Sequence, residues 1–274
     1  MESTPSTVTS KDGTTIAFER LGSGPAILLV SPALGDHSGN AKLANVLTRN
    51  LTVINYDRRG RGASADTHPY AVAREVEDIQ ALIEAAGSPA YLFGNSSGAV
   101  LALEAAATLG SQVKALLMYE PPFVVDDSRP PLPEEYLAYL HDLISQGRRG
   151  DAVQYFMSRA VGVPEEMLDG MRRDPMWASL EAAADTLPYD GEVMGDTMSG
   201  KALPAHRWDS VEAPALVMAG GASPAWIQHA AQALAGTLPR CKYRVLEGCD
   251  HSAVTTAPVD LATTMYGFFL AEHL

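Results

Sequence analysis

Cysteine and basic residues are scarce in this chain. It has two cysteines, Cys241 and Cys249, and 20 lysines and arginines against 33 aspartates and glutamates. Two cysteines build no disulfide framework, and no C-x-x-C pair or histidine cluster has the spacing of a metal site. The formal net charge of −13 repels phosphate backbones and anionic membrane surfaces, so we expect neither nucleic acid nor a membrane as a partner.

Long hydrophobic runs are also missing. No window is apolar over the length needed to cross a bilayer, and residues 1–13 lack the basic and then apolar pattern of a signal peptide. We therefore expect a cytoplasmic protein. What is present is an ordinary globular composition, 46% hydrophobic and 19% charged, over 274 residues. That length favours one large α/β domain with an inserted segment over two independent domains.

Apolar runs and helical stretches alternate along the chain, which predicts a mainly parallel sheet covered by helices. Residues 26–30 form a continuous apolar run, as expected of a strand buried on both faces. Further strands are expected over 6–10, 14–20, 51–56, 90–93, 115–120, 213–219 and 242–247. Helices are expected over 71–86, 99–107, 224–236 and 257–272.

Residues 121–210 break this alternation, because they carry helical patterns at 133–147, 149–160 and 174–186 without a clear strand. We therefore divide the chain into a core, 1–120 and 211–274, and a helical cap, 121–210, over the carboxyl edge of the sheet. Phe123, Met157 and Trp177 of this cap are candidates for lining an apolar substrate pocket. The alternative for each is that it only fastens the cap to the core.

Residues 94–98 read Gly-Asn-Ser-Ser-Gly, a G-x-S-x-G pattern between an expected strand and an expected helix. Strand, sharp turn and helix together describe a nucleophile elbow, which lifts the hydroxyl of Ser96 clear of the backbone. Gly94 and Gly98 allow the strand and the helix to pack closely around the turn. The alternative is a loop serine in an ordinary connection.

A serine hydroxyl is a poor nucleophile near neutral pH, so it needs a base, and the base needs a carboxylate to orient it. His251 is the best candidate base, because it follows the last expected strand at the carboxyl edge of the sheet. The other histidines fall on the expected cap, helices or surface loops. Cys249 lies nearby, but nothing beside it in the sequence is suited to activate a thiol.

These motifs, together with Asp-Arg-Arg-Gly-Arg-Gly at 57–62 and Gly-Cys-Asp-His at 248–251, resemble the α/β-hydrolase fold family. The resemblance covers nearly the whole chain and places residues 121–210 at the usual cap position. It implies Ser96 as nucleophile and His251 as base, in the chain order serine, acid, histidine. It also implies that the arginines at 58, 59 and 61 brace their loop and do not form an anion site.

The acid departs from the family's common pattern. In most relatives it follows the strand that corresponds to 215–219, but here Ser223 stands where an aspartate is expected. Glu120 is the best replacement, because it ends the strand directly after the elbow helix, as in some family members. Asp126 and Asp127 are the alternatives. Asp250 is adjacent to His251, and adjacent residues seldom meet in the required geometry.

Stabilising the tetrahedral oxyanion needs two preorganised N–H donors, each worth roughly 3 kcal/mol of barrier. The backbone N–H of Ser97 is expected to supply one. The other should come from the loop at 31–37, where Pro32 has no N–H. We expect Ala33 as the donor, with Leu34 second; Leu34 is also a candidate pocket residue.

The sequence therefore predicts a cofactor-free serine hydrolase, with no metal, that cleaves an ester, lactone or related acyl bond of a small, largely apolar molecule. A fold alone does not fix a reaction. A lyase, a C–C bond-cleaving enzyme or a cyclase on the same fold is therefore one alternative. A small-ligand binding protein is the other, and the presence of both Ser96 and His251 argues against it.

Overall fold

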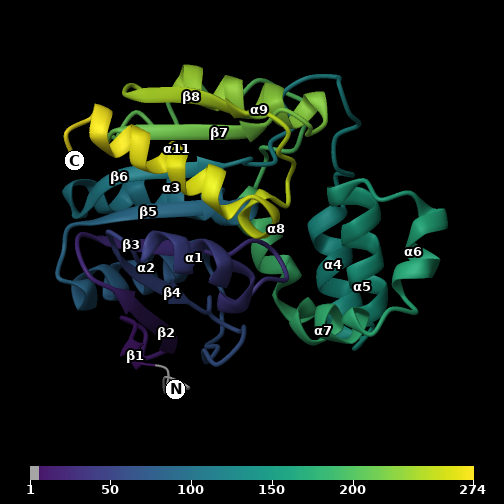
Figure 1. Ribbon diagram of the computed structural model, residues 1–274. Coiled ribbons are helices and arrows are strands. Elements are labelled where there is room, and N and C mark those ends of the chain that lie inside the picture. The colour runs from purple at the N-terminus through teal and green to yellow at the C-terminus, as the bar shows by residue number, and fades with distance from the viewer. Residues whose placement is uncertain (1–5) are drawn as a thin grey trace.

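The computed structural model describes residues 6–274 and is built around one eight-stranded sheet (Figure 1). The first five residues of the predicted core segment, 1–5, lie outside the described residues. The strand order is β1-β2-β4-β3-β5-β6-β7-β8. The strands are β1 (Ser6–Thr9), β2 (Thr15–Gly22), β3 (Ala26–Val30), β4 (Thr52–Tyr56), β5 (Ala90–Asn95), β6 (Val113–Tyr119), β7 (Ala215–Gly220) and β8 (Cys241–Leu246).

Strands β3 to β8 are parallel to one another, while β2 is antiparallel to both of its neighbours, β1 and β4. Every residue of β3, β4, β5 and β7 is buried, because helices cover both faces of a parallel sheet. The helices of the core are α1 (Ala41–Leu47), α2 (Val72–Ala86), α3 (Ser97–Leu109), α9 (Ala225–Thr237), α10 (Ala253–Thr256) and α11 (Pro258–Ala271), with η1 (His37–Asn40) and η2 (Gly110–Gln112). The predicted α/β fold with a mostly parallel sheet is confirmed.

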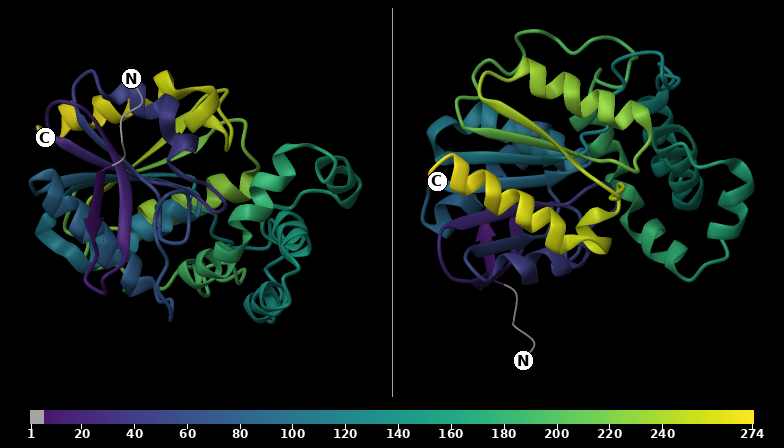
Figure 2. Two further views of the ribbon diagram at one scale, coloured as in Figure 1. Left: turned by 90° about the horizontal axis from the view of Figure 1, so that it is seen from below. Right: turned by 45° about the horizontal axis from the view of Figure 1, so that its top comes forward.

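The alternation of side chains along each strand divides the core into two layers. Leu28 and Val30 of β3 pack with α2, α3 and α9 in one apolar cluster. Ile27 and Leu29 pack with α1, α10 and α11 in the other. The two layers of helices are visible on opposite sides of the sheet in Figure 2.

Residues 121–210 form a helical insertion between β6 and β7 (Figure 1). It contains α4 (Tyr136–Ser145), α5 (Arg149–Phe156), η3 (Met157–Val161), α6 (Glu165–Met171), α7 (Met176–Ala183), η4 (Ala184–Thr186) and α8 (Leu187–Met194). No strand occurs between β6 and β7, as predicted. The insertion has a small apolar core of its own, made by Tyr136, Leu140, Leu143, Ala152, Val153, Trp177, Ala184 and Leu187.

The insertion stands at the end of the sheet where the parallel strands finish (Figure 1). This is the edge at which open α/β sheets carry their ligand sites. Over residues 6–274, none of the helices combines the length and the apolarity that crossing a bilayer requires.

Candidate active site

The predicted elbow is formed by Ser96, between the end of β5 at Asn95 and the start of α3 at Ser97. Its backbone has φ 54° and ψ −131°, a conformation that non-glycine residues adopt only under constraint. The Ser96 N–H donates to the carbonyl of Tyr119 at 2.9 Å, which ties the elbow to the end of β6. The half-buried Ser96 therefore sits at the carboxyl edge of the sheet, as predicted.

The two glycines of the motif are required by close backbone contact. A Cβ on Gly94 would lie 2.2 Å from the carbonyl oxygen of Gly98. A Cβ on Gly98 would lie 2.4 Å from the carbonyl oxygen of Val30, on β3. Real Cβ atoms do not approach backbone oxygens so closely, so both positions need glycine for β5, α3 and β3 to meet.

His251 and Glu120 lie in direct contact, although 131 residues separate them in the chain. The distance between His251 Nδ1 and Glu120 Oε2 is 2.6 Å. The Glu120 carboxylate is fully buried, while the His251 side chain is 44% exposed. This contact leaves Nε2 of His251 as the nitrogen available to another group. Asp126, one of the alternative acids, instead contacts His229 at 2.8 Å on the surface.

The second oxygen of Glu120 is held by two donors, one from the last residue of β7 and one from the loop after it. Gly220 N–H and Ser223 Oγ each donate to Glu120 Oε1 at 2.6 Å. The buried carboxylate thus has three partners, as a buried charge requires. The sequence showed that Ser223 cannot supply the negative charge. It did not indicate that its hydroxyl binds the carboxylate that does.

The loop that carries His251 is fixed by backbone contacts. Tyr119 Oη donates to the carbonyl of Asp250 at 2.6 Å, and Ala222 N–H donates to the carbonyl of Cys249 at 2.9 Å. The 220–223 loop therefore supports both Glu120 and the histidine loop. Burial, followed by the carboxylates of Asp260, Asp250 and Glu120, raises the pKa of the Cys249 thiol, so this cysteine favours its unreactive protonated form.

Backbone strain gathers around the same edge. Four non-glycine residues of the 6–274 range have a positive φ, and three of them, Leu34, Ser96 and Glu120, belong to the predicted site. Such conformations cost about 1–3 kcal/mol each and concentrate at functional sites. Across the described chain, no hydrogen bond to the Ser96 hydroxyl is found, so its contact with His251 stays a prediction.

The predicted oxyanion loop follows β3 and lies beside the elbow, because Val30 of β3 pairs with Gly94 of β5. Residues 32–35 form a tight turn, with Gly35 N–H donating to the carbonyl of Pro32 at 3.1 Å. The N–H of Ala33 donates to Ser97 Oγ at 2.9 Å. Within residues 6–274 the N–H groups of Leu34 and Ser97 have no acceptor.

The arginines that follow β4 are braces, as the sequence indicated. Arg58 and Arg59 are fully buried. Arg58 forms a bidentate pair with Glu75 at 2.6 and 2.7 Å, and Arg59 pairs with Asp78 at 2.7 and 2.8 Å. Their guanidinium groups are therefore engaged by carboxylates of α2, and also by Asp190 for Arg58 and Asp12 for Arg59.

The candidate pocket residues separate into two groups. Leu34 and Met157 pack against the apolar cluster of the insertion, which contains Trp177. Phe123 is fully buried in the main core and stacks on Trp208 with ring centroids 5.8 Å apart. Phe123 therefore has the fastening role that the sequence offered as the alternative. Trp177 is 5% exposed and donates from Nε1 to Glu181 at 2.9 Å.

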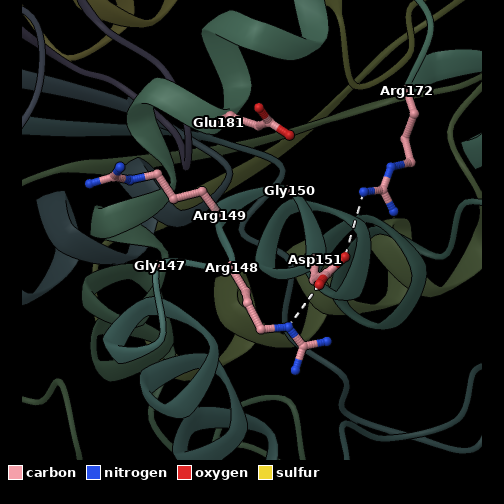
Figure 3. Close-up of a pocket in the computed structure, with 7 residues that line it drawn as sticks. All are labelled: Gly147, Arg148, Arg149, Gly150, Asp151, Arg172 and Glu181. Carbon is pink, nitrogen blue, oxygen red and sulfur yellow. Dashed lines mark hydrogen bonds and ion pairs between the residues drawn. The ribbon is translucent and has the colours of Figure 1, made fainter.

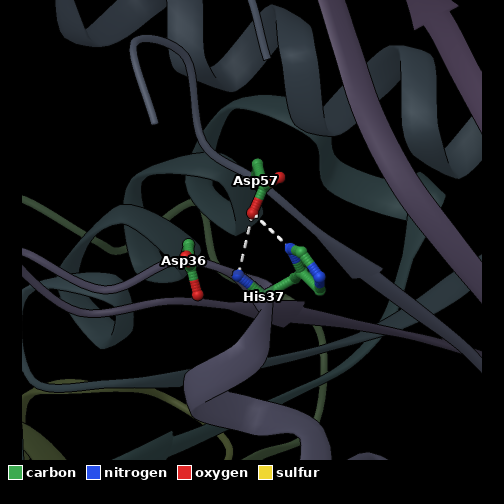
Figure 4. Close-up of side chains that lie close together, drawn as sticks. All are labelled: Asp36, His37 and Asp57. Carbon is green, nitrogen blue, oxygen red and sulfur yellow. Dashed lines mark hydrogen bonds and ion pairs between the residues drawn. The ribbon is translucent and has the colours of Figure 1, made fainter. Parts of the chain in front are cut away.

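Asp36 and His37, at the end of the loop after β3, lie close to Asp57, which follows β4 (Figure 4). Asp57 Oδ1 accepts the His37 N–H at 2.8 Å and lies 2.7 Å from His37 Nδ1, and Asp57 Oδ2 accepts the Ala63 N–H at 2.9 Å. Asp36 Oδ1 accepts the Ser38 N–H and caps η1. These bonds explain the cluster as a brace between the loop after β3 and the loop after β4.

Two hollows lie on the insertion, and Ser96 lines neither. One, of about 340 Å³, is lined by 147–151, Arg172 and Glu181 (Figure 3). Its arginines pair with acids, including Arg148 with Asp151 at 2.9 Å. The other, of about 370 Å³, lies between α6 and α7 and is lined mainly by methionines, Trp177 and Leu180.

Comparison with known proteins agrees with this architecture. The model of the alpha/beta hydrolase family matches residues 27–264, so the chain belongs to that family. The crystal structure of an alpha/beta hydrolase from Sphaerobacter thermophilus DSM 20745 is 53% identical, has a TM-score of 0.88 and is matched over 96% of this chain and 100% of that chain. These matches support a hydrolase.

Two other matches are partial or distant. The "Uncharacterized hydrolase YraK" of Bacillus subtilis (strain 168) is 37% identical over 113 residues, which is 40% of this chain and 42% of that protein. The chain thus matches less than half of the length of this curated relative. The enol-lactonase from Burkholderia xenovorans LB400 has a TM-score of 0.71 over 97% of this chain and all of that chain. At 19% identity, this likeness shows the fold alone.

Proposed function

We propose that the protein is a serine hydrolase that cleaves a carboxylic ester, lactone or related acyl bond of a small, largely apolar molecule. The observation that carries the proposal is the 2.6 Å contact of His251 Nδ1 with the buried Glu120 carboxylate, at the strand edge where the strained Ser96 elbow lies. A base held by a buried carboxylate beside an elbow serine is the arrangement that acyl transfer requires.

In the proposed mechanism Ser96 Oγ attacks the substrate carbonyl, while Nε2 of His251 takes its proton. Glu120 keeps the proton of His251 on Nδ1 and stabilises the imidazolium that forms. The imidazolium then gives its proton to the leaving alcohol, which departs from the acyl-enzyme. Water, deprotonated by Nε2 of the same histidine, then attacks the acyl carbon. The bond to Ser96 Oγ breaks, the imidazolium returns its proton to Oγ, and the acid is released. These steps use side chains of this chain alone.

The oxyanion is stabilised by the N–H of Ser97 and by an N–H of the loop after β3. Ala33 was the expected second donor, but its N–H already donates to Ser97 Oγ. We therefore assign the second donor to Leu34. Leu34 has a positive φ of 59°, a conformation that non-glycine residues adopt only under constraint and that concentrates at functional sites.

The helical insertion acts in this proposal as the predicted cap, and Leu34 and Met157 contribute apolar surface to substrate binding. Leu34 belongs to the oxyanion loop and also packs on the apolar cluster of the insertion. A substrate carbonyl at Ser96 would therefore lie next to apolar side chains. Lactones are included because a lactone carbonyl is attacked by the same serine chemistry as an open-chain ester.

Hydrolysis of a panel of small apolar esters and lactones in ¹⁸O-labelled water tests the proposal. We expect the wild type to incorporate solvent oxygen into the released carboxylate and Ser96→Ala to lose turnover by a factor of about 10³ or more. Circular dichroism and the melting temperature of the variant should match the wild type. Unchanged turnover in folded Ser96→Ala would contradict the proposal.

A further inference from the structure

A buried ion cluster joins the helical insertion to the oxyanion loop. Its members are Arg58, Arg61, Glu75 and Asp190, each at most 3% exposed. Asp190 comes from α8, at the point where the insertion joins the sheet (Figure 1). The mechanism proposed above uses none of these four side chains.

Asp190 has partners on both carboxylate oxygens. Its Oδ1 accepts Ser97 Oγ at 2.8 Å and Arg58 Nη1 at 2.7 Å, and its Oδ2 accepts Arg61 Nη2 at 2.5 Å. Burial by itself would raise the pKa of Asp190, but the charges of Arg61 and Arg58 outweigh it and lower that pKa. The carboxylate is therefore charged when it receives the Ser97 hydroxyl.

The same side chains reach the oxyanion loop by two routes. Ser97 Oγ donates to Asp190 and accepts the N–H of Ala33 at 2.9 Å. Arg61 donates to the carbonyl of Pro32 at 2.6 Å, and Arg58 donates to the carbonyl of Ser31 at 3.2 Å. Residues 31–33 of the loop after β3 are thus each hydrogen-bonded to a side chain that also contacts Asp190.

We propose that Asp190 and the Ser97 hydroxyl are positioning groups that hold the 32–35 turn against the elbow, so that the N–H groups of Leu34 and Ser97 converge on the substrate carbonyl oxygen. This inference rests on the proposed serine mechanism. The hydroxyl of Ser97 occupies the N–H of Ala33 and fixes the turn, and the neighbouring Leu34 N–H is left to face the oxyanion. Asp190 links this turn to α8 through direct hydrogen bonds to Ser97, Arg58 and Arg61.

Ser97→Ala is the direct test, because it removes one hydroxyl and leaves the backbone donor of Ser97 in place. The readout is the second-order rate constant for reaction of Ser96 with a small fluorophosphonate, followed by intact mass. We expect a loss of about ten- to a hundredfold, since misplacing an oxyanion donor reduces transition-state stabilisation. For an ester that the wild type hydrolyses, the loss should fall on kcat with KM little changed.

Tyr70→Phe is the matched control. Tyr70 Oη donates to Glu75 at 2.8 Å and to the carbonyl of Tyr189 on α8 at 3.3 Å, so it joins the same cluster to the same helix. Among the described residues, no hydrogen bond joins the Tyr70 hydroxyl to the 32–35 turn. We expect Tyr70→Phe to react at the wild-type rate, even if its melting temperature falls as far as that of Ser97→Ala.

Two results would overturn the inference. Ser97→Ala reacting at the wild-type rate or faster would mean that the hydroxyl does not place the turn. An equal loss of rate in Tyr70→Phe would mean that the effect comes only from loosening the cluster. A wild type that fails to react at all contradicts the Ser96 nucleophile itself, and so is distinguishable from both.

Discussion

Glu120 is a carboxylate partner for His251 that comes from a different strand end than the family's common pattern predicts. Most relatives are expected to carry their acid after β7, where this chain has Ser223. Here the acid ends β6, and Ser223 and Gly220 donate to it from the position that an aspartate would occupy. The carboxylate thus comes from the end of β6 and its donors from the end of β7 and the loop after it, while His251 Nδ1 keeps a carboxylate partner.

Glu120→Gln should lower kcat by about 10³- to 10⁴-fold, because an amide no longer fixes the proton of His251 on Nδ1 or stabilises the imidazolium. Steady-state kinetics with any ester that the wild type hydrolyses measures this. Asp126→Asn is the control, because Asp126 lies on the surface against His229, and it should retain wild-type kcat. A silent Glu120→Gln alongside an inactive Asp126→Asn would show that the wrong acid was assigned.

At the residue scale, the candidate residues proposed from the sequence are ones that directly follow a strand. The sequence carries no signal for contacts that form only when the insertion packs on the core. Ser96, Glu120 and His251 each follow a strand of the same sheet, so parallel strands bring them to one edge. Asp190 contacts Ser97 across 93 residues, and no spacing or motif connects the two. The engagement of the Ala33 N–H by Ser97 Oγ depends on the same packing.

At the scale of elements, the elbow is the tightest junction near the site. Gly94→Ala should destabilise the fold by several kcal/mol or prevent folding, because its Cβ would collide with the Gly98 carbonyl at 2.2 Å. Chemical denaturation measures the free energy of unfolding. Gly267→Ala is the control, since nothing lies within 4 Å of its Cβ in α11, and it should stabilise by about 0.5–1 kcal/mol. Equal stability of the two variants would contradict the close-packing argument.

The strands and long helices of the core were predictable from their apolar patterns, whereas α6 and α8 of the insertion were not. Both are short, at seven and eight residues, and isolated helices of that length are not stable in water. α8 also contains Pro188 and Gly191, which weaken a helical pattern. Its stability comes from burial and from the ion pairs of Asp190, and these exist only in the folded molecule.

At the scale of the whole molecule, the brace of His37 and Asp57 links stability to pH. Burial by itself lowers the pKa of His37, but the hydrogen bond and charge of Asp57, with Glu19 and Asp36, raise it above 6.5. The folded state therefore holds the proton more tightly than the unfolded state. The resulting stabilisation is fully present below about pH 6.5 and is lost as the pH rises through the raised folded pKa.

His37→Asn should therefore lower the melting temperature more at about pH 5.5 than at about pH 9. Differential scanning fluorimetry of the two proteins across this range measures the difference. Comparing His37→Asn with the wild type at each pH removes the contribution of all other titratable groups. If the difference in melting temperature stays constant with pH, or grows toward high pH, then the folded state does not hold the His37 proton more tightly beside Asp57.

The central claim is that Ser96 is an activated nucleophile, and intact mass after exposure to a fluorophosphonate tests it most directly. The account predicts a single adduct on the wild type and none on Ser96→Ala with the same melting temperature. An adduct on both proteins, or no adduct on folded wild type, would contradict it.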